Sequence, residues 1–108
     1  MQKLNYVTDP NYTTAIEMPS DYVDAKSLAA NVAESFAKPS GARFVRLTGN
    51  LLFYFNARGT AVAPTDISNG SASTTTPVGV RQMFCVDGIA SISVVAPAVT
   101  LVTAEWWE

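Results

Sequence analysis

The sequence predicts an all-β protein: a small antiparallel β-sandwich or barrel with an extended N-terminal arm. Short segments rich in β-branched and aromatic residues alternate apolar with polar side chains, and Gly or Pro turns separate them at regular spacing. Of the 108 residues, 48% are hydrophobic and only 15% are charged, which is typical of a chain that folds around a core. This length favours a single domain.

Residues 1–26 form the predicted arm, and residues 27–108 form the predicted sandwich. Pro10 and Pro19 interrupt the arm, and its aromatic residues follow neither helical nor strand spacing. Two interpretations remain open, because such a segment either packs over its own domain or drapes over a neighbouring subunit. The hypothesis to test is that it reaches a neighbour.

The N-terminal half of the sandwich contains three predicted strand regions. Residues 25–37 are compatible with a helix or a strand, and their partial period of two favours a strand. Residues 42–48 place Val45 and Leu47 on one face of the next strand. Residues 51–56 are apolar on both faces, which is typical of a central strand covered on both sides.

The C-terminal half contains three more predicted strands, at residues 80–86, 90–95 and 99–107. The dipeptide at 87–88 is Asp-Gly, which favours a hairpin between the first two. Residues 65–76 are rich in Ser and Thr and predict a surface loop. Because loops of this length are uncommon in compact domains, this one is a candidate contact element.

The residue inventory argues against enzymatic chemistry. The chain has no histidine, so the Ser-His-Asp and Cys-His catalytic arrangements are impossible. Cys85 is the only cysteine, and its strand context predicts a small buried hydrophobe. No glycine-rich phosphate loop is present. We therefore expect no catalytic residue, no metal and no cofactor, and the absence of an apolar span or signal peptide predicts a protein made in the reducing cytoplasm.

Cationic and aromatic side chains are the candidate contact residues. No acid occurs between Glu34 and Asp66, an interval that contains three arginines. These arginines lack interleaved aromatics, so a nucleic-acid partner is not expected. Adjacent strand residues point to opposite faces, so one C-terminal tryptophan should cap the core and the other should lie in a subunit contact. The predicted partner-binding residues are Tyr6, Tyr12, Tyr22, Arg43, Arg46, Arg58, Trp106 and Trp107.

Five segments carry a family resemblance, namely residues 39–47, 53–56, 70–73, 82–86 and 92–96. In this order they resemble the small β-sandwich structural proteins of tailed bacteriophages, a group that includes capsid decoration (cement) proteins. The N-terminal arm and the Trp-Trp terminus lie outside the resemblance.

The resemblance implies a virion protein that binds the major capsid protein on the phage head. Such a protein adds buried interface without chemistry, and it occurs as a homo-oligomer or in multiple copies on the shell. Two alternatives stay open. One is a carbohydrate- or receptor-binding module of a head fibre or tail part, which would use the Ser/Thr loop and one exposed tryptophan. The other is a neck or tail-completion protein.

Overall fold

The computed structural model describes residues 1–4, 6–8, 15–17, 19–63 and 74–108, and these residues form strands and turns without a helix. In this part of the chain there is consequently no helix with the length and apolar character to cross a membrane. The all-β prediction is confirmed. The strands are β1 (Tyr6–Thr8), β2 (Ala15–Glu17), β3 (Tyr22–Leu28), β4 (Glu34–Ala37), β5 (Phe44–Gly49), β6 (Phe53–Asn56), β7 (Thr76–Val78), β8 (Arg81–Cys85), β9 (Ser91–Val95) and β10 (Thr100–Trp107).

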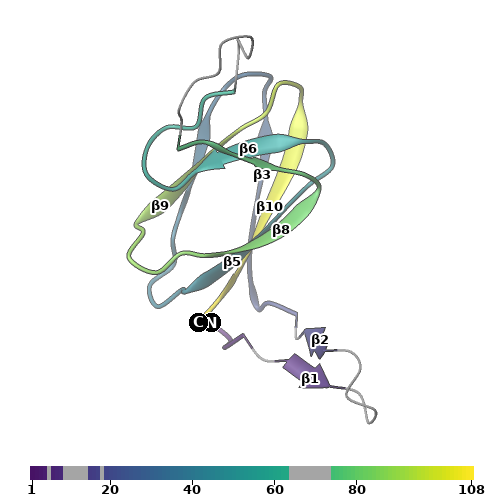
Figure 1. Ribbon diagram of the computed structural model, residues 1–108, viewed down its shortest axis with the longest axis vertical. Helices are drawn as coiled ribbons and strands as arrows, with labels where there is room; N and C mark the ends of the chain where they lie inside the picture. Colours follow the sequence, from purple (N-terminus) through teal and green to yellow (C-terminus); the bar gives the residue numbers. More distant parts are fainter. Residues whose placement is uncertain (5, 9–14, 18, 64–73) are drawn as a thin grey trace.

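Two four-stranded antiparallel sheets pack face to face (Figure 1). Their strand orders are β3-β10-β5-β8 and β4-β9-β6-β7. The predicted β-sandwich is confirmed. Strands β1 and β2 form a separate two-stranded hairpin that projects away from the sandwich (Figure 1).

The strand pairing is nested along the sequence. Strand β3 pairs with β10, β4 with β9, β5 with β8, and β6 with β7. The strands are thus paired from the outermost to the innermost, as when a long hairpin is folded over on itself. This pattern defines the eight-stranded jelly roll, a double sheet with Greek-key connections.

Nested pairing sorts the loops to two ends of the sandwich. The loops at 29–33, 50–52, 79–80 and 96–99 lie at one end, and backbone contacts join them. Asn31 N donates to Ala96 O at 2.7 Å, and Gly49 N, at the end of β5, donates to Val80 O at 2.8 Å. The chain termini lie together at the opposite end (Figure 1).

Alternation along the strands builds the core between the sheets. In β5, Val45 and Leu47 are buried and the intervening residues are partly exposed, which confirms the predicted faces. In β10, Val102, Ala104 and Trp106 point into the core. Because β10 has neighbours on both sides, its inward side chains lie near the centre of the sheet.

The predicted strands at 25–37 and 51–56 differ from the structure. Residues 25–37 contain the end of β3, a turn and β4, because Asn31 adopts a left-handed conformation with φ of 61°. Asparagine tolerates this conformation better than most residues. The central strand begins at Phe53, so Leu51 and Leu52 lie in a loop with exposed side chains. Their apolar character predicted that both side chains are buried. Because they lie in the turn after Gly49, their side chains are exposed instead.

The boundary between arm and sandwich falls earlier than residue 26. Strand β3 begins at Tyr22 and pairs with β10 over its whole length, so residues 22–26 belong to the sandwich. The first residues are also attached to it, because Glu108 N donates to Gln2 O at 2.9 Å and Leu4 N donates to Glu108 O at 3.2 Å. The hairpin of β1 and β2 therefore lies between two anchored segments.

Candidate functional site

Both C-terminal tryptophans are fully buried. Trp106 faces the core, whereas Trp107 lies on the outer face of the sheet, where the guanidinium carbon of Arg46 is 5.0 Å from its ring centroid. The side chains do point to opposite faces, as predicted. The prediction that one of them lies in an exposed subunit contact is wrong for the folded chain, because neither ring is accessible.

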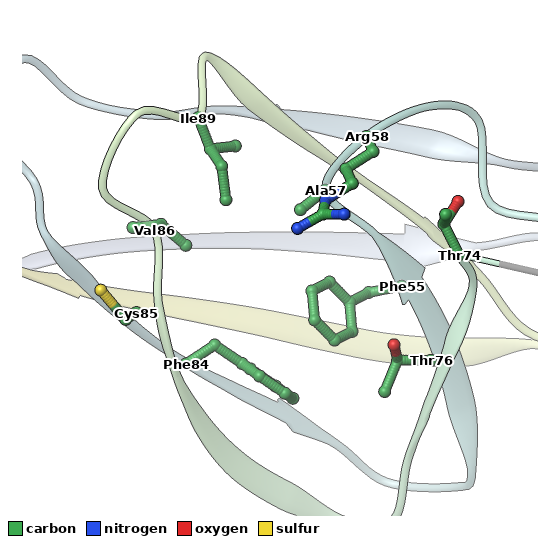
Figure 2. Close-up of a pocket in the computed structure, with 9 residues that line it drawn as sticks. All are labelled: Phe55, Ala57, Arg58, Thr74, Thr76, Phe84, Cys85, Val86 and Ile89. Carbon is green, nitrogen blue, oxygen red and sulfur yellow. The ribbon is translucent and has the colours of Figure 1, made fainter.

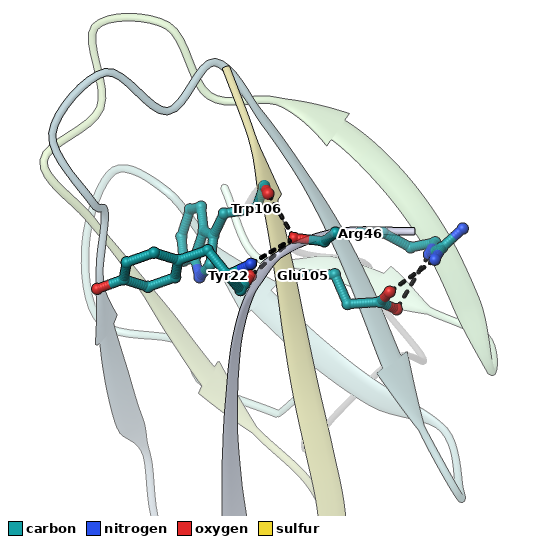
Figure 3. Close-up of polar contacts among 5 residues, drawn as sticks. Tyr22, Arg46, Glu105 and Trp106 are labelled. Atoms are coloured by element: carbon teal, nitrogen blue, oxygen red, sulfur yellow. Dashed lines mark hydrogen bonds and ion pairs between the residues drawn. The ribbon is translucent and has the colours of Figure 1, made fainter. Parts of the chain in front are cut away.

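Arg46 is held by a carboxylate of the neighbouring strand (Figure 3). Its Nε donates to Glu105 Oε1 at 3.1 Å, and its Nη2 donates to Glu105 Oε2 at 2.6 Å. The two residues are directly opposite in the β5–β10 register, and their side chains are only 12% and 19% exposed. Paired hydrogen bonds of this type are among the stronger ones in proteins. Arg46 therefore stabilises the sheet over Trp107.

Arg43 forms a second ion pair at the end that carries the termini. Its Nη2 lies 3.1 Å from Asp87 Oδ2, and these side chains are 59% and 50% exposed. The hydrogen bond and the charge of Asp87 raise the pKa of Arg43 above its ordinary value. The guanidinium is thus charged at any physiological pH, and solvent screens the pair.

The two ion pairs should contribute differently to stability. We expect Glu105→Gln to lower the free energy of unfolding by about 2 kcal/mol, because the largely buried Arg46 side chain loses its carboxylate partner. Asp87→Asn, the matched change in the exposed pair, should have little effect. Urea denaturation followed by circular dichroism measures both. Equal losses for the two variants would contradict this assignment.

The predicted tyrosines have different positions. Tyr22 is the first residue of β3 and is exposed. Its backbone N donates to the Ser20 hydroxyl at 3.0 Å, which in turn donates to the Trp106 carbonyl at 2.6 Å (Figure 3). The backbone of Tyr6 belongs to β1, and Tyr12 lies outside the described residues. Most of the Ser/Thr loop, residues 64–73, also lies outside them.

A pocket opens between the two sheets, on the side where β6 and β8 face each other (Figure 2). Phe55 of β6 and Phe84 of β8 meet there, with ring centroids 4.2 Å apart and planes tilted by 48°. The pocket is about 460 Å³ in volume. Its lining consists of Phe55, Ala57, Arg58, Thr74, Thr76, Phe84, Cys85, Val86 and Ile89.

Cys85 is exposed at this pocket, so the prediction of a buried cysteine is wrong. Strand β8 is an edge strand, and its alternation turns Phe84 and Val86 toward the core and Cys85 away from it. Arg58 was predicted as a contact residue and does line the pocket. The sequence does not indicate Phe55 and Phe84 as pocket residues, because their contact depends on how the two sheets pack.

The end of the sandwich opposite the termini is apolar and uncharged. We call it the aliphatic end, defined by the loops at 29–33, 50–52, 79–80 and 96–99 together with Leu101. These four loops contain no Asp, Glu, Lys or Arg. They expose large aliphatic side chains, of which Val99 at 68% and Val80 at 61% are the most accessible. The exposed large aliphatic residues of this end are Val32, Leu51, Leu52, Val80, Val99 and Leu101.

The described residues contain no cluster of three or more metal-ligating side chains. No protein-family model, curated protein or solved structure matches the chain. A jelly roll by itself is compatible with many functions. The physical chemistry of the surfaces, namely the pocket and the aliphatic end, therefore carries the functional argument.

Proposed function

We propose that the chain is a non-enzymatic structural protein of a tailed-phage particle. In this proposal it is a decoration protein that binds the major capsid protein on the head in multiple copies, and the aliphatic end is its contact surface. The proposal depends above all on one observation, the charge-free exposure of the aliphatic end.

A surface of this kind favours a protein partner. Contiguous exposed apolar patches mark interaction sites on soluble proteins, and the centres of protein interfaces are depleted in charge. A backbone hydrogen bond joins the loops at 29–33 and 96–99, another joins Val80 to the end of β5, and Leu101 N donates to Asn50 Oδ1 at 3.0 Å. The aliphatic side chains are therefore presented from a connected base, which limits the entropy lost on binding.

Two further observations agree with a place in a virion. The jelly roll is an architecture used by viral capsid domains, and it is also used by lectins. The sequence segments that resemble phage decoration proteins include β5 and β6, at the centres of the two sheets. Both observations are similarities to other proteins. The exposed apolar surface of the aliphatic end is independent of them and supports the proposal on physical grounds.

The carbohydrate-binding alternative loses the aromatic platform that was expected for it, because Trp106 and Trp107 are buried. Exposed tryptophan was the group expected to stack on a sugar ring. A pocket with Phe55 and Arg58 remains as a different kind of site. A neck or tail-completion protein would also use an apolar contact surface, and the location of binding distinguishes it from a decoration protein.

Charges placed on the aliphatic end should abolish attachment. The double variant Leu51→Asp and Leu101→Asp should bind phage heads assembled without this chain about tenfold more weakly or worse, because desolvating new carboxylates opposes burial. Co-sedimentation of purified protein with such heads measures the binding. Val23→Asp is the matched control, because Val23 is an equally exposed aliphatic residue on β3 away from this end.

Three outcomes would contradict the proposal. The first is equal binding of heads by the double variant and the Val23→Asp control. The second is a lack of binding to heads by the unmodified protein. The third is binding of the unmodified protein to isolated tails and necks in place of heads. The last result would favour the neck or tail-completion alternative. Circular dichroism of each variant establishes that the sandwich is intact.

A further inference from the structure

The pocket between β6 and β8 has an apolar wall within a lining that is otherwise polar. Phe55 and Val86 are buried, and Phe84 and Ile89 are partly buried against the core cluster. The two rings come from different sheets, so the pocket reaches into the space between them. Its volume of about 460 Å³ lies within the range of sites for small molecules. The aromatic and aliphatic side chains of this wall can pack against one face of a ring.

Arg58 supplies a positive charge at this pocket. The nine lining residues include no acid, and the guanidinium of Arg58 forms no hydrogen bond or ion pair with a described residue. Figure 2 shows this guanidinium directed toward the other side chains that line the pocket. Arg43 and Arg46, by contrast, each bind a carboxylate of the chain itself.

The backbone that carries Arg58 is fixed by a buried asparagine. Arg58 N donates to Asn56 Oδ1 at 2.8 Å, and Asn56 Nδ2 donates to Thr74 Oγ1 at 2.7 Å. Asn56 is buried, and both hydrogen bonds are partly shielded from water. The network holds the start of the arginine side chain beside the pocket, and the guanidinium remains available to a ligand.

We propose that this pocket binds a carboxylate carried on a six-membered ring, with the ring against Phe55 and Phe84 and the carboxylate on Arg58. A planar guanidinium matches a carboxylate through two parallel hydrogen bonds. The lining holds one cation, which balances a monoanion and leaves a phosphate dianion under-compensated. This inference goes beyond the proposed function and does not depend on attachment to a shell.

Two classes of ligand carry a carboxylate on a six-membered ring, namely aromatic acids and acidic sugars. A second depression adjoins Arg58 and is lined by hydroxyl groups of Ser35, Thr60, Ser91 and Ser93. The hydroxyls of an acidic sugar would extend toward it, whereas an aromatic acid has no group that would use it. Ser91→Ala should therefore weaken binding of an acidic sugar and leave binding of an aromatic acid unchanged.

The test is a titration of the purified chain with benzoate and with glucuronate, monitored by amide chemical shifts. Benzyl alcohol and glucose are the neutral controls of matched ring size. We expect at least one acid to bind, with its largest shifts at Phe55, Arg58 and Phe84, and to bind about fivefold more tightly than its neutral control.

Arg58→Gln should lower the affinity for the acid about fivefold, to that of the neutral control, because the charge-assisted bonds are lost. Arg81→Gln is the matched control, since Arg81 is an exposed arginine of β8 that does not line the pocket. It should leave the affinity unchanged. Equal effects of the two variants would indicate general charge attraction and overturn the proposal.

If neither acid binds, or if the chemical shifts map away from the pocket, the pocket is not a carboxylate site.

Discussion

In urea denaturation, Trp106→Ala should lower the free energy of unfolding by about 3–5 kcal/mol. Trp106 is fully buried in β10, opposite Tyr22 of β3 and Val45 of β5, and its ring belongs to the core between the sheets. Truncation removes its apolar contacts and leaves a cavity that neighbouring strands cannot fill. For a domain whose total stability is on the order of 5–15 kcal/mol, this loss removes a large fraction of the free energy of unfolding.

Trp106→Phe is the control for that experiment. The indole Nε1 is buried and has no hydrogen-bond partner among the described residues, so phenylalanine removes no hydrogen bond made there and keeps most of the ring volume. Its cost should be about 1–2 kcal/mol, below that of alanine. Far-UV circular dichroism follows unfolding independently of tryptophan fluorescence. A loss under about 1 kcal/mol for the alanine variant would mean that this ring does not pack as described.

Gly49→Ala should destabilise the sandwich by about 2–3 kcal/mol, although it adds a single methyl group. A Cβ at this position would lie 2.6 Å from Cδ1 and 2.8 Å from Cε1 of Phe53, and 3.1 Å from the Leu51 carbonyl oxygen. Phe53 is fully buried, so its ring has no free space into which it can move. The close approach of β5 to the start of β6 requires a residue without a side chain.

Gly79→Ala separates this steric effect from the general effect of replacing glycine. A Cβ at Gly79 would meet no atom within 4 Å. Loss of glycine's freedom in the unfolded chain should make this variant neutral or slightly more stable. Thermal unfolding of the two variants side by side gives the comparison. Similar melting temperatures would contradict the crowding of Gly49 against Phe53.

The sequence predicted the strands well because alternation reports burial directly. Val45 and Leu47 face the core as their spacing indicated, and the Asp-Gly dipeptide at 87–88 lies in the turn between β8 and β9. Alternation does not report which strands are neighbours. The nested pairing of β3 with β10 depends on contacts between distant segments, so the sequence indicated a sandwich or barrel without specifying the jelly roll.

The candidate sites were predicted less completely, for the same physical reason. Arg58 was identified from its charge, but Arg43 and Arg46 look alike in sequence and are already paired with Asp87 and Glu105. Leu51 and Leu52 read as part of a core strand, because apolar composition alone does not distinguish a buried residue from one exposed for binding. The aliphatic end could not be predicted from the sequence, because its loops come together only through the order of the strands in the two sheets.

The nested pairing also constrains how the chain reaches its native state. Strand β10 lies between β3 and β5, so the sheet that contains them lacks its central strand until residues 100–107 have been synthesised. Folding dominated by such distant pairings is slow, and its incomplete forms expose strand edges. During synthesis the earlier strands should thus remain open to association with other chains, and the final eight-residue strand completes the fold.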